Sequence, residues 1–80
     1  MHADAIRNIL KEHSKLSVEL DELSNESDLY KAGLTSLTTV NVMLAIEDHF
    51  DVEFEDHMLS RGTFQSVNAL VAAVEELLEA

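Results

Sequence analysis

Apolar residues recur at helical spacing in three stretches of this 80-residue chain, with polar segments between them. In the first stretch, residues 5–15, one face carries Ile6, Ile9, Leu10 and His13. Apolar positions three and four residues apart are typical of an amphipathic helix. We therefore expect a helix over 5–15, with His13 half-buried on its apolar side rather than acting as a metal ligand.

The C-terminal stretch gives the clearest helix prediction. Ser66 is a good N-cap residue, because a serine hydroxyl accepts a backbone N–H of the first turn. The apolar stripe that follows consists of Val67, Leu70, Val71, Val74, Leu77 and Leu78. This spacing predicts a helix that starts after Ser66 and packs one face against the rest of the domain.

A middle helix is predicted from Thr35–Ser36 to about Phe50. Gly33 interrupts the chain just before it, and either Thr35 or Ser36 can cap its start. At about 100° per residue this helix has two apolar faces. One face carries Val42, Ile46 and Phe50, with Thr39 among them and Met43 on a flank, and the other carries Leu37, Val40 and Leu44 beside Glu47 and Asp48.

The second of these faces has two interpretations. If the Val42 face fills the core, the Leu37 face is left toward solvent. An exposed apolar stripe edged with carboxylates is typical of a docking surface for a basic partner. Alternatively, the loop around residues 16–23 covers the stripe, and periodicity alone does not choose between the two.

The connecting segments are polar and irregular. Residues 16–30 show no sustained helical period, so we expect a long loop there. The apolar side chains that pin this loop should be Leu16, Val18, Leu20 and Leu23. Residues 51–55 are too short and too acidic for a strand, and a short helical turn over 56–60 should end at Gly62. Residues 1–80 are thus predicted to form one all-helical domain.

Composition narrows the function classes. Five Lys and Arg against 16 Asp and Glu give a formal net charge of −11, which disfavours binding to nucleic acid or to an anionic membrane surface. The same charge either keeps a small protein soluble or steers basic partners onto it. No cysteine is present for a disulfide or a thiolate zinc site. The chain also lacks a membrane-spanning apolar run and a signal peptide pattern, so we expect a cytoplasmic protein.

Residues 28–37 read D-L-Y-K-A-G-L-T-S-L, and this run resembles the modification site of acyl carrier proteins, D-L-x-x-x-G-x-D-S-L. The resemblance continues beyond this run. Residues 46–50 are similar to the L-E-x-x-F pattern of the family's second helix, and Phe54 and Asp56 match its I-x-I-x-D stretch. Residues 64–70 match the entry to its last helix, so the resemblance covers nearly the whole chain.

The resemblance implies a small four-helix bundle of the acyl carrier type, with three main helices, a short third helix and a long first loop. It implies that Ser36 receives a 4′-phosphopantetheine arm from coenzyme A. A helix N-terminus suits this modification, because its free N–H groups and positive dipole end favour a phosphodiester. The arm would hold an acyl or aminoacyl group as a thioester, and the protein itself would not be an enzyme.

The same resemblance implies a set of partners. They are a phosphopantetheinyl transferase, a loading ligase or acyltransferase, and downstream synthase enzymes with basic docking patches. The partner-binding residues that we expect are Thr35, Leu37, Val40, Asn41, Leu44, Glu47 and Asp48. We expect a monomer, since the spare apolar surface is needed for transient docking.

The chain departs from the carriers of fatty acid synthesis at several positions. Thr35 stands where many of them have aspartate, and Thr38 and Asn41 stand where they tend to have acids. Glu55 replaces a common proline. These differences favour a specialised carrier whose cargo is a polyketide starter, a modified fatty acid or an amino acid. Because the sequence shows no linker or neighbouring domain, we expect it to be a stand-alone carrier.

A metal-binding protein is one alternative. Acidic residues and histidines crowd together at Asp48, His49, Asp51, Glu53, Glu55, Asp56 and His57. A calcium loop of the EF-hand type needs ligands at alternating positions and a glycine midway. No glycine lies between Asp48 and Ser60, so we expect loose divalent-ion binding by the acidic cluster rather than a specific metal site.

Two further alternatives concern Ser36. In a purely structural adaptor, Ser36 would stay unmodified and the Leu37 stripe would bind one partner. In an enzyme, Ser36 would be the nucleophile and would need a base oriented by a third group. No G-x-S-x-G elbow surrounds Ser36, and a chain of this size has little room for a substrate pocket, which disfavours the enzyme.

Overall fold

The computed structural model describes residues 2–14, 16–17 and 19–79. Within these ranges the regular secondary structure is helical, and there is no strand. The α-helices are α1 (His2–His13), α2 (Ser36–Phe50) and α3 (Val67–Glu79), and the 3-10 turns are η1 (Leu20–Glu22), η2 (Asp56–Met58) and η3 (Arg61–Phe64). Over these ranges, none of the helices has the length and apolar character needed to cross a membrane. The predicted all-helical fold is confirmed.

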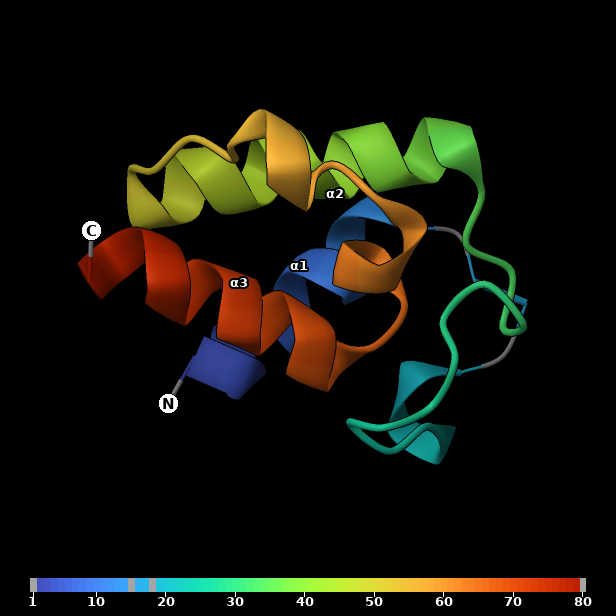
Figure 1. The fold of residues 1–80 in the computed structure, drawn as a ribbon. Helices are drawn as coiled ribbons and strands as arrows, with labels where there is room; N and C mark the ends of the chain where they lie inside the picture. Colours follow the sequence, from blue (N-terminus) through green and yellow to red (C-terminus); the bar gives the residue numbers. More distant parts are fainter. Residues whose placement is uncertain (1, 15, 18, 80) are drawn as a thin grey trace.

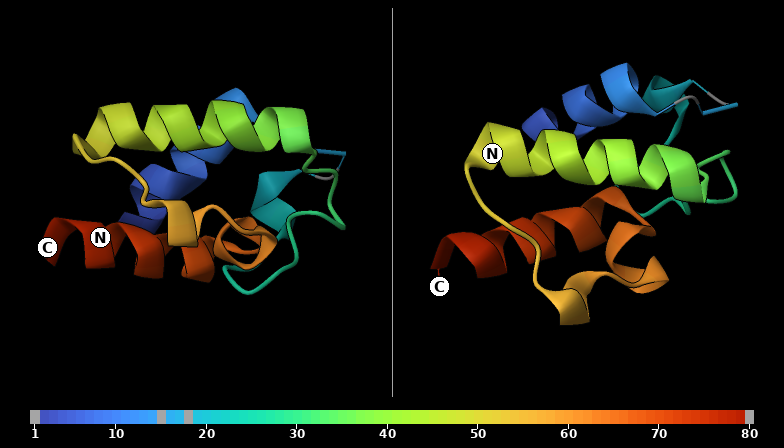
Figure 2. Two further views of the ribbon diagram at one scale, coloured as in Figure 1. Left: turned by 45° about the horizontal axis from the view of Figure 1, so that its top comes forward. Right: turned by 90° about the horizontal axis from the view of Figure 1, so that it is seen from above.

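α1 holds the domain together, because it contacts both α2 and α3. In Figure 1, α2 lies along one side, α3 along the other, and α1 crosses behind them. The first turn of α1, the last turn of α2 and the last turn of α3 lie at the same end of the molecule (Figure 2). The rings of His2 and Phe50 accordingly meet edge to face there, with centroids 5.4 Å apart. The start of α2 lies at the opposite end, beside the long loop.

The core draws on every α-helix and on the connecting segments. Its largest fully buried side chains are Ile6, Leu10, Leu29, Val42, Ile46, Val67, Leu70 and Val74. Burying one such aliphatic side chain stabilises the fold by about 2 kcal/mol. Two of the eight, Val42 and Ile46, lie on the face of α2 that the sequence assigns to the core, so this face is fixed inward.

The boundaries of α1 differ from the prediction. The helix begins at His2 rather than at residue 5, and Asp4 in its first turn favours this start because it complements the helix dipole. It ends at His13, where Ser14 donates both its N–H and its hydroxyl to the carbonyl of Leu10. The predicted last residue, Lys15, lies outside the described residues. His13 is exposed rather than half-buried, so that prediction is wrong.

Arg7 pins the long loop, a role that the sequence pattern did not indicate. Its guanidinium donates to the Asn25 side-chain oxygen at 2.8 Å, to the Leu20 carbonyl at 2.8 Å and to the Leu23 carbonyl at 3.0 Å. Leu20 is buried in η1, while Leu16 and Leu23 are half-buried against the core. These three apolar anchors are as predicted, whereas Val18 lies outside the described residues.

The short third helix consists of two 3-10 turns rather than one helical turn. η2 covers Asp56–Met58, and Gly62 lies inside η3 instead of ending the first turn. Gly62 also lacks the positive φ of a helix-ending glycine, so that prediction is wrong. Stacking of the Phe54 and Phe64 rings, with centroids 5.4 Å apart, folds this segment back onto the core.

Candidate functional site

The start of α2 is closed by a reciprocal cap between two threonines. Thr35 Oγ1 accepts the backbone N–H of Thr38 at 3.2 Å, and Thr38 Oγ1 accepts the backbone N–H of Thr35 at 2.9 Å. Such a capping box satisfies two backbone donors at once. Of the two predicted cap residues, Thr35 is therefore the one used. Ser36 is the first residue of the helix and is exposed.

The turn before α2 shows what the first residues of the 28–37 motif do in the fold. Asp28 Oδ1 accepts the N–H of Tyr30 at 2.9 Å and of Lys31 at 3.3 Å, which closes the turn. Leu29 is fully buried and donates its N–H to the carbonyl of Gln65 at 2.7 Å. The turn is thereby tied to the segment before α3, and it holds the start of α2 in a fixed place.

Gly33 makes the last bend before α2 possible. Its φ of 118° lies in the region that favours glycine. A Cβ at this position would lie 2.9 Å from the backbone nitrogen of Ser17, which itself donates to the carbonyl of Ala32 at 2.7 Å. A side chain at residue 33 would therefore push against the long loop as well as strain the backbone.

The hydrogen bonds around Asp28 change its acidity. Partial burial raises the pKa of the Asp28 carboxyl, but the backbone N–H groups of Lys31 and Tyr30, the Gln65 amide and the charge of Lys31 together outweigh it. The net pKa lies below the ordinary value of an aspartate. Each of these groups stabilises the ionised carboxylate.

α2 presents its second apolar face to solvent. Leu37, Val40 and Leu44 are 76%, 48% and 54% exposed, although all three are large and apolar. The described residues of the loop, 16–17 and 19–23, do not cover them: Leu20 is buried against the core, and Leu16 and Leu23 pack there as well. Exposed aliphatic side chains in a row on one helix form a contiguous apolar surface.

The polar residues expected beside this stripe differ in their exposure to solvent. Thr35, Asn41 and Asp48 are exposed. Glu47 is half-buried, and its Oε2 accepts the backbone N–H of Phe54 at 2.8 Å. The Glu47 carboxylate therefore also fixes the chain that leaves α2, a contact that helix periodicity does not reveal because Phe54 lies beyond the helix.

Leu59 extends the apolar surface and was missed by the sequence reasoning. It is 49% exposed and lies in the link between η2 and η3. With Val40 it lines a hollow of about 290 Å³ between α2 and this link, whose other walls are Tyr30, Thr39, Met43, Ser60, Arg61 and Phe64. Leu59 reaches this position only because segments distant in the sequence contact each other, so no local sequence pattern indicates its role.

Polar side chains also border this hollow. The Arg61 guanidinium lies 4.1 Å from the centre of the Tyr30 ring, a cation–π contact between η3 and the turn before α2. The Thr39 hydroxyl is buried and has no hydrogen-bond partner among the described residues. The hollow is therefore mainly apolar, with one unused hydroxyl on its α2 side.

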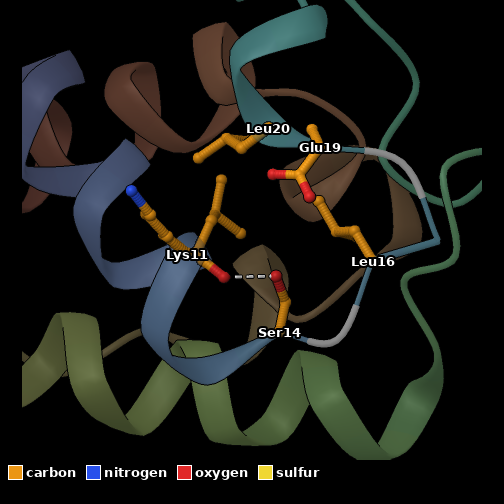
Figure 3. Close-up of a pocket in the computed structure, with 6 residues that line it drawn as sticks. Lys11, Ser14, Leu16, Glu19 and Leu20 are labelled. Carbon is orange, nitrogen blue, oxygen red and sulfur yellow. Dashed lines mark hydrogen bonds between the residues drawn. The ribbon is translucent and has the colours of Figure 1, made fainter.

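A smaller hollow lies between the end of α1 and the long loop (Figure 3). It measures about 120 Å³, and the residues that line it are Leu10, Lys11, Ser14, Leu16, Glu19 and Leu20. The Ser14 hydroxyl inside it donates to the Leu10 carbonyl at 2.5 Å, so this polar group is satisfied. None of the lining residues belongs to α2 or to the turn before it, which separates this hollow from Ser36.

The start of α2 fits a covalently attached phosphate group. The Ser36 hydroxyl is exposed and is not used as the N-cap, because Thr35 has that role. The first-turn N–H groups of Ser36 and Leu37 have no acceptor within the helix, and a helix N-terminus favours negative charge. No acidic residue lies in the first turn to compete with an anion.

Comparison with known proteins agrees with this geometry. The family model for the phosphopantetheine attachment site matches residues 4–74. An aminoacyl carrier protein of Agrobacterium fabrum is 42% identical over 74 residues, which covers 92% of this chain and 89% of that protein.

Solved structures give the same result. The chain is similar to one in the crystal structure of an engineered Bradyrhizobium japonicum glycine:[carrier protein] ligase with carrier protein from Agrobacterium tumefaciens and ATP. The TM-score is 0.90 and the identity 39%, over 95% of this chain and 99% of that one. For a holo acyl carrier protein from Nitrosomonas europaea the TM-score is 0.86 and the identity 33%, over 100% and 99%. The chain therefore belongs to the phosphopantetheine-dependent carrier proteins, which hold an acyl or aminoacyl group as a thioester on a covalently attached 4′-phosphopantetheine arm.

Proposed function

We propose that Ser36 is the attachment residue of the arm. The observation that carries this proposal is the Thr35–Thr38 capping box, since it closes the helix start without the Ser36 hydroxyl. Attachment joins Ser36 Oγ to the phosphorus next to the pantetheine of coenzyme A. The P–O bond of the pyrophosphate breaks, adenosine 3′,5′-bisphosphate leaves, and the serine proton passes to a base of the transferase.

When bound, the arm supplies the thiol that the cysteine-free chain lacks. The residues around Ser36 then have positioning roles. The α2 N-terminus stabilises the phosphodiester charge through its N–H groups and dipole. Asp28 and buried Leu29 hold the turn before α2, so that the attachment point has one orientation.

We further propose that the cargo is an amino acid and that a carrier-protein ligase loads it. The relative at 42% identity is an aminoacyl carrier protein, and the similar structure at 39% identity contains a glycine:[carrier protein] ligase. The acyl carrier protein from Nitrosomonas europaea is more distant, at 33%. These similarities favour an aminoacyl cargo over a fatty acyl or polyketide cargo.

The proposed docking surface consists of Thr35, Leu37, Val40, Asn41, Leu44, Glu47, Asp48 and Leu59. Its exposed aliphatic side chains supply contact area, and Asp48 adds negative charge at the edge. A net charge of −11 attracts enzymes with basic patches and speeds encounter without requiring tight binding. The chain itself would act as a monomer and catalyse no step, because its task is to present the tethered cargo.

An intact-mass measurement tests the attachment residue. We expect the purified chain to gain one phosphopantetheine when it is incubated with coenzyme A and a phosphopantetheinyl transferase. Ser36→Ala should gain nothing, whereas Ser24→Ala, which alters an exposed serine of the long loop, should be modified like the wild type. Modification of Ser36→Ala would contradict the assignment, and an unmodified wild type with an active native transferase would favour a structural adaptor.

A loading assay tests the cargo. We expect the holo protein, with ATP and a glycine:[carrier protein] ligase, to gain one amino acid that hydroxylamine releases from a thioester. The same holo protein with an acyl-carrier-protein synthetase and a fatty acid is the comparison. Loading with fatty acid alone would refute the aminoacyl cargo, while the Ser36 assignment would stand on the mass measurement.

A further inference from the structure

Three side chains with metal-binding atoms come together on the surface. All three are distant from Ser36 in the sequence. Glu55, His57 and Glu76 each offer one ligand atom, and all three atoms lie within 4.8 Å of one another. His57 Nε2 is 3.4 Å from Glu76 Oε2, although the two residues are 19 positions apart. All three residues are exposed, so an ion in solution can reach them.

The fold positions these residues on two rigid supports. Glu55 precedes η2 in an extended conformation and makes no side-chain cap to it, so its carboxylate is not used by the turn. The neighbouring Met58 and Phe54 are buried, which anchors η2 to the core and limits where His57 can lie. Glu76 belongs to α3, whose opposite face carries buried Val67 and Val74.

We propose that Glu55, His57 and Glu76 form a surface site for a divalent transition-metal ion of the Zn²⁺ type. In a tetrahedral Zn²⁺ site with bonds of about 2.0 to 2.1 Å, neighbouring ligand atoms lie about 3.3 Å apart. The His57–Glu76 distance of 3.4 Å already has this value. Rotation of the flexible Glu55 side chain brings in the third ligand, and water takes the fourth position.

The imidazole distinguishes this cluster from the acidic surface around it. Ca²⁺ and Mg²⁺ prefer oxygen ligands, whereas an imidazole nitrogen suits Zn²⁺ and its neighbours in the series. Two carboxylates held this close repel each other unless a cation or a protonated His57 lies between them. The competing interpretation is therefore a simple ion pair between a protonated His57 and its two glutamates.

The site differs from the acidic cluster of residues 48–57, whose ligands lie close together in the chain with a spacing that does not suit calcium. Folding brings Glu55 and His57 to Glu76 of α3 instead. A bound ion would link the segment before η3 to α3, and so it would stabilise the folded chain.

Zn²⁺ binding to the untagged chain tests the proposal, measured by calorimetry in excess Mg²⁺ and by NMR of the histidine rings. We expect one Zn²⁺ to bind with perturbation of the His57 ring and with a rise in melting temperature. His57→Gln and Glu76→Gln should each weaken the affinity at least about tenfold. His13→Gln is the matched control, because His13 also lies beside one glutamate, Glu12 at 3.9 Å, and it should bind like the wild type.

Each other outcome overturns the proposal. If His57→Gln and the wild type bind Zn²⁺ equally, the ion is attracted only by the general negative charge. If Zn²⁺ perturbs His2, His13 or His49 rather than His57, the site lies elsewhere. If the wild type binds no Zn²⁺ in excess Mg²⁺, the cluster is a His57-centred ion pair.

Discussion

Thr35 and Thr38 cap each other: each hydroxyl accepts the backbone N–H of the other residue, and the two hydroxyl oxygens lie 3.0 Å apart. In the pattern of fatty acid synthesis carriers that the chain resembles, an aspartate stands at the position of Thr35, and an aspartate carboxylate is also a strong N-cap acceptor. The threonine therefore retains the capping role without adding a negative charge next to Ser36.

Removing this cap should destabilise α2. We expect Thr35→Ala to lower the free energy of unfolding by about 1 kcal/mol, since the N–H of Thr38 loses its acceptor. Thr35→Asp should restore most of the loss, because the carboxylate caps the same N–H. Urea unfolding of both variants measures this, and an equal loss in the two variants would show that capping is not the cause.

The apolar surface of α2 should matter for loading rather than for folding. Leu44 is 54% exposed, so we expect Leu44→Ala to change the free energy of unfolding by less than about 0.5 kcal/mol. If ligases dock on this surface, the kcat/KM of loading falls about tenfold. Leu78→Ala on α3 removes another exposed leucine and should leave loading unchanged. Equal loading by the wild type and both variants would remove Leu44 from the docking surface.

Arg7 should contribute to stability far more than its neighbours on α1. Arg7→Ala leaves the carbonyls of Leu20 and Leu23 without their charged donor, so we expect a loss of about 2 to 3 kcal/mol. Lys11→Ala, which alters an exposed cation one turn further along α1, should have little effect. Chemical denaturation compares the two, and similar small losses would mean that the loop does not depend on Arg7.

Gly33 should tolerate no side chain. Its φ of 118° and the 2.9 Å approach of Ser17 predict that Gly33→Ala lowers the free energy of unfolding by more than about 1 kcal/mol. Gly62→Ala is the matched control, because a Cβ at Gly62 would make only an ordinary contact with the Ser60 hydroxyl oxygen at 4.0 Å, and Gly62 has no positive φ. Thermal unfolding of both variants gives the comparison, and an unaffected Gly33→Ala would contradict the described geometry.

Asp28 should make the free energy of unfolding depend on pH. Because its pKa is lower in the folded chain than in the unfolded chain, the unfolded chain takes up the proton first as pH falls. The ionised Asp28 carboxylate contributes its full stabilisation at pH values above its pKa in the unfolded chain, about 3.9. This stabilisation disappears as pH falls through the lower pKa that Asp28 has in the folded chain.

Asp28→Asn keeps a side-chain oxygen for the N–H groups of Tyr30 and Lys31 but cannot ionise. We expect the stability difference between the wild type and this variant to shrink as pH falls from about 5 to about 3. Urea unfolding at a series of pH values measures it. A difference that stays constant over this interval would show that the folded chain does not lower the pKa of Asp28.

Sequence patterns predicted several parts of this fold that depend on local physics, although they misplaced the start of α1 and the turn end at Gly62. The two faces of α2 follow from periodicity, and the cap at Ser66, whose hydroxyl accepts the N–H of Ala69 at 3.1 Å, follows from residue type. Contacts between distant segments were not predictable in this way. Arg7 with the loop carbonyls, Glu47 with the N–H of Phe54 and Leu59 beside α2 all depend on how the chain folds back.

The position of Ser36 at one end of α2 has a practical consequence. A helix of 15 residues is about 22 Å long, and the first turn of α1 and the last turn of α3 lie at its far end. A biosensor chip or a fluorophore coupled near either of those turns would thus face away from Ser36. If Ser36 carries the arm as proposed, the carrier immobilised in this orientation leaves the arm open to enzymes that flow past.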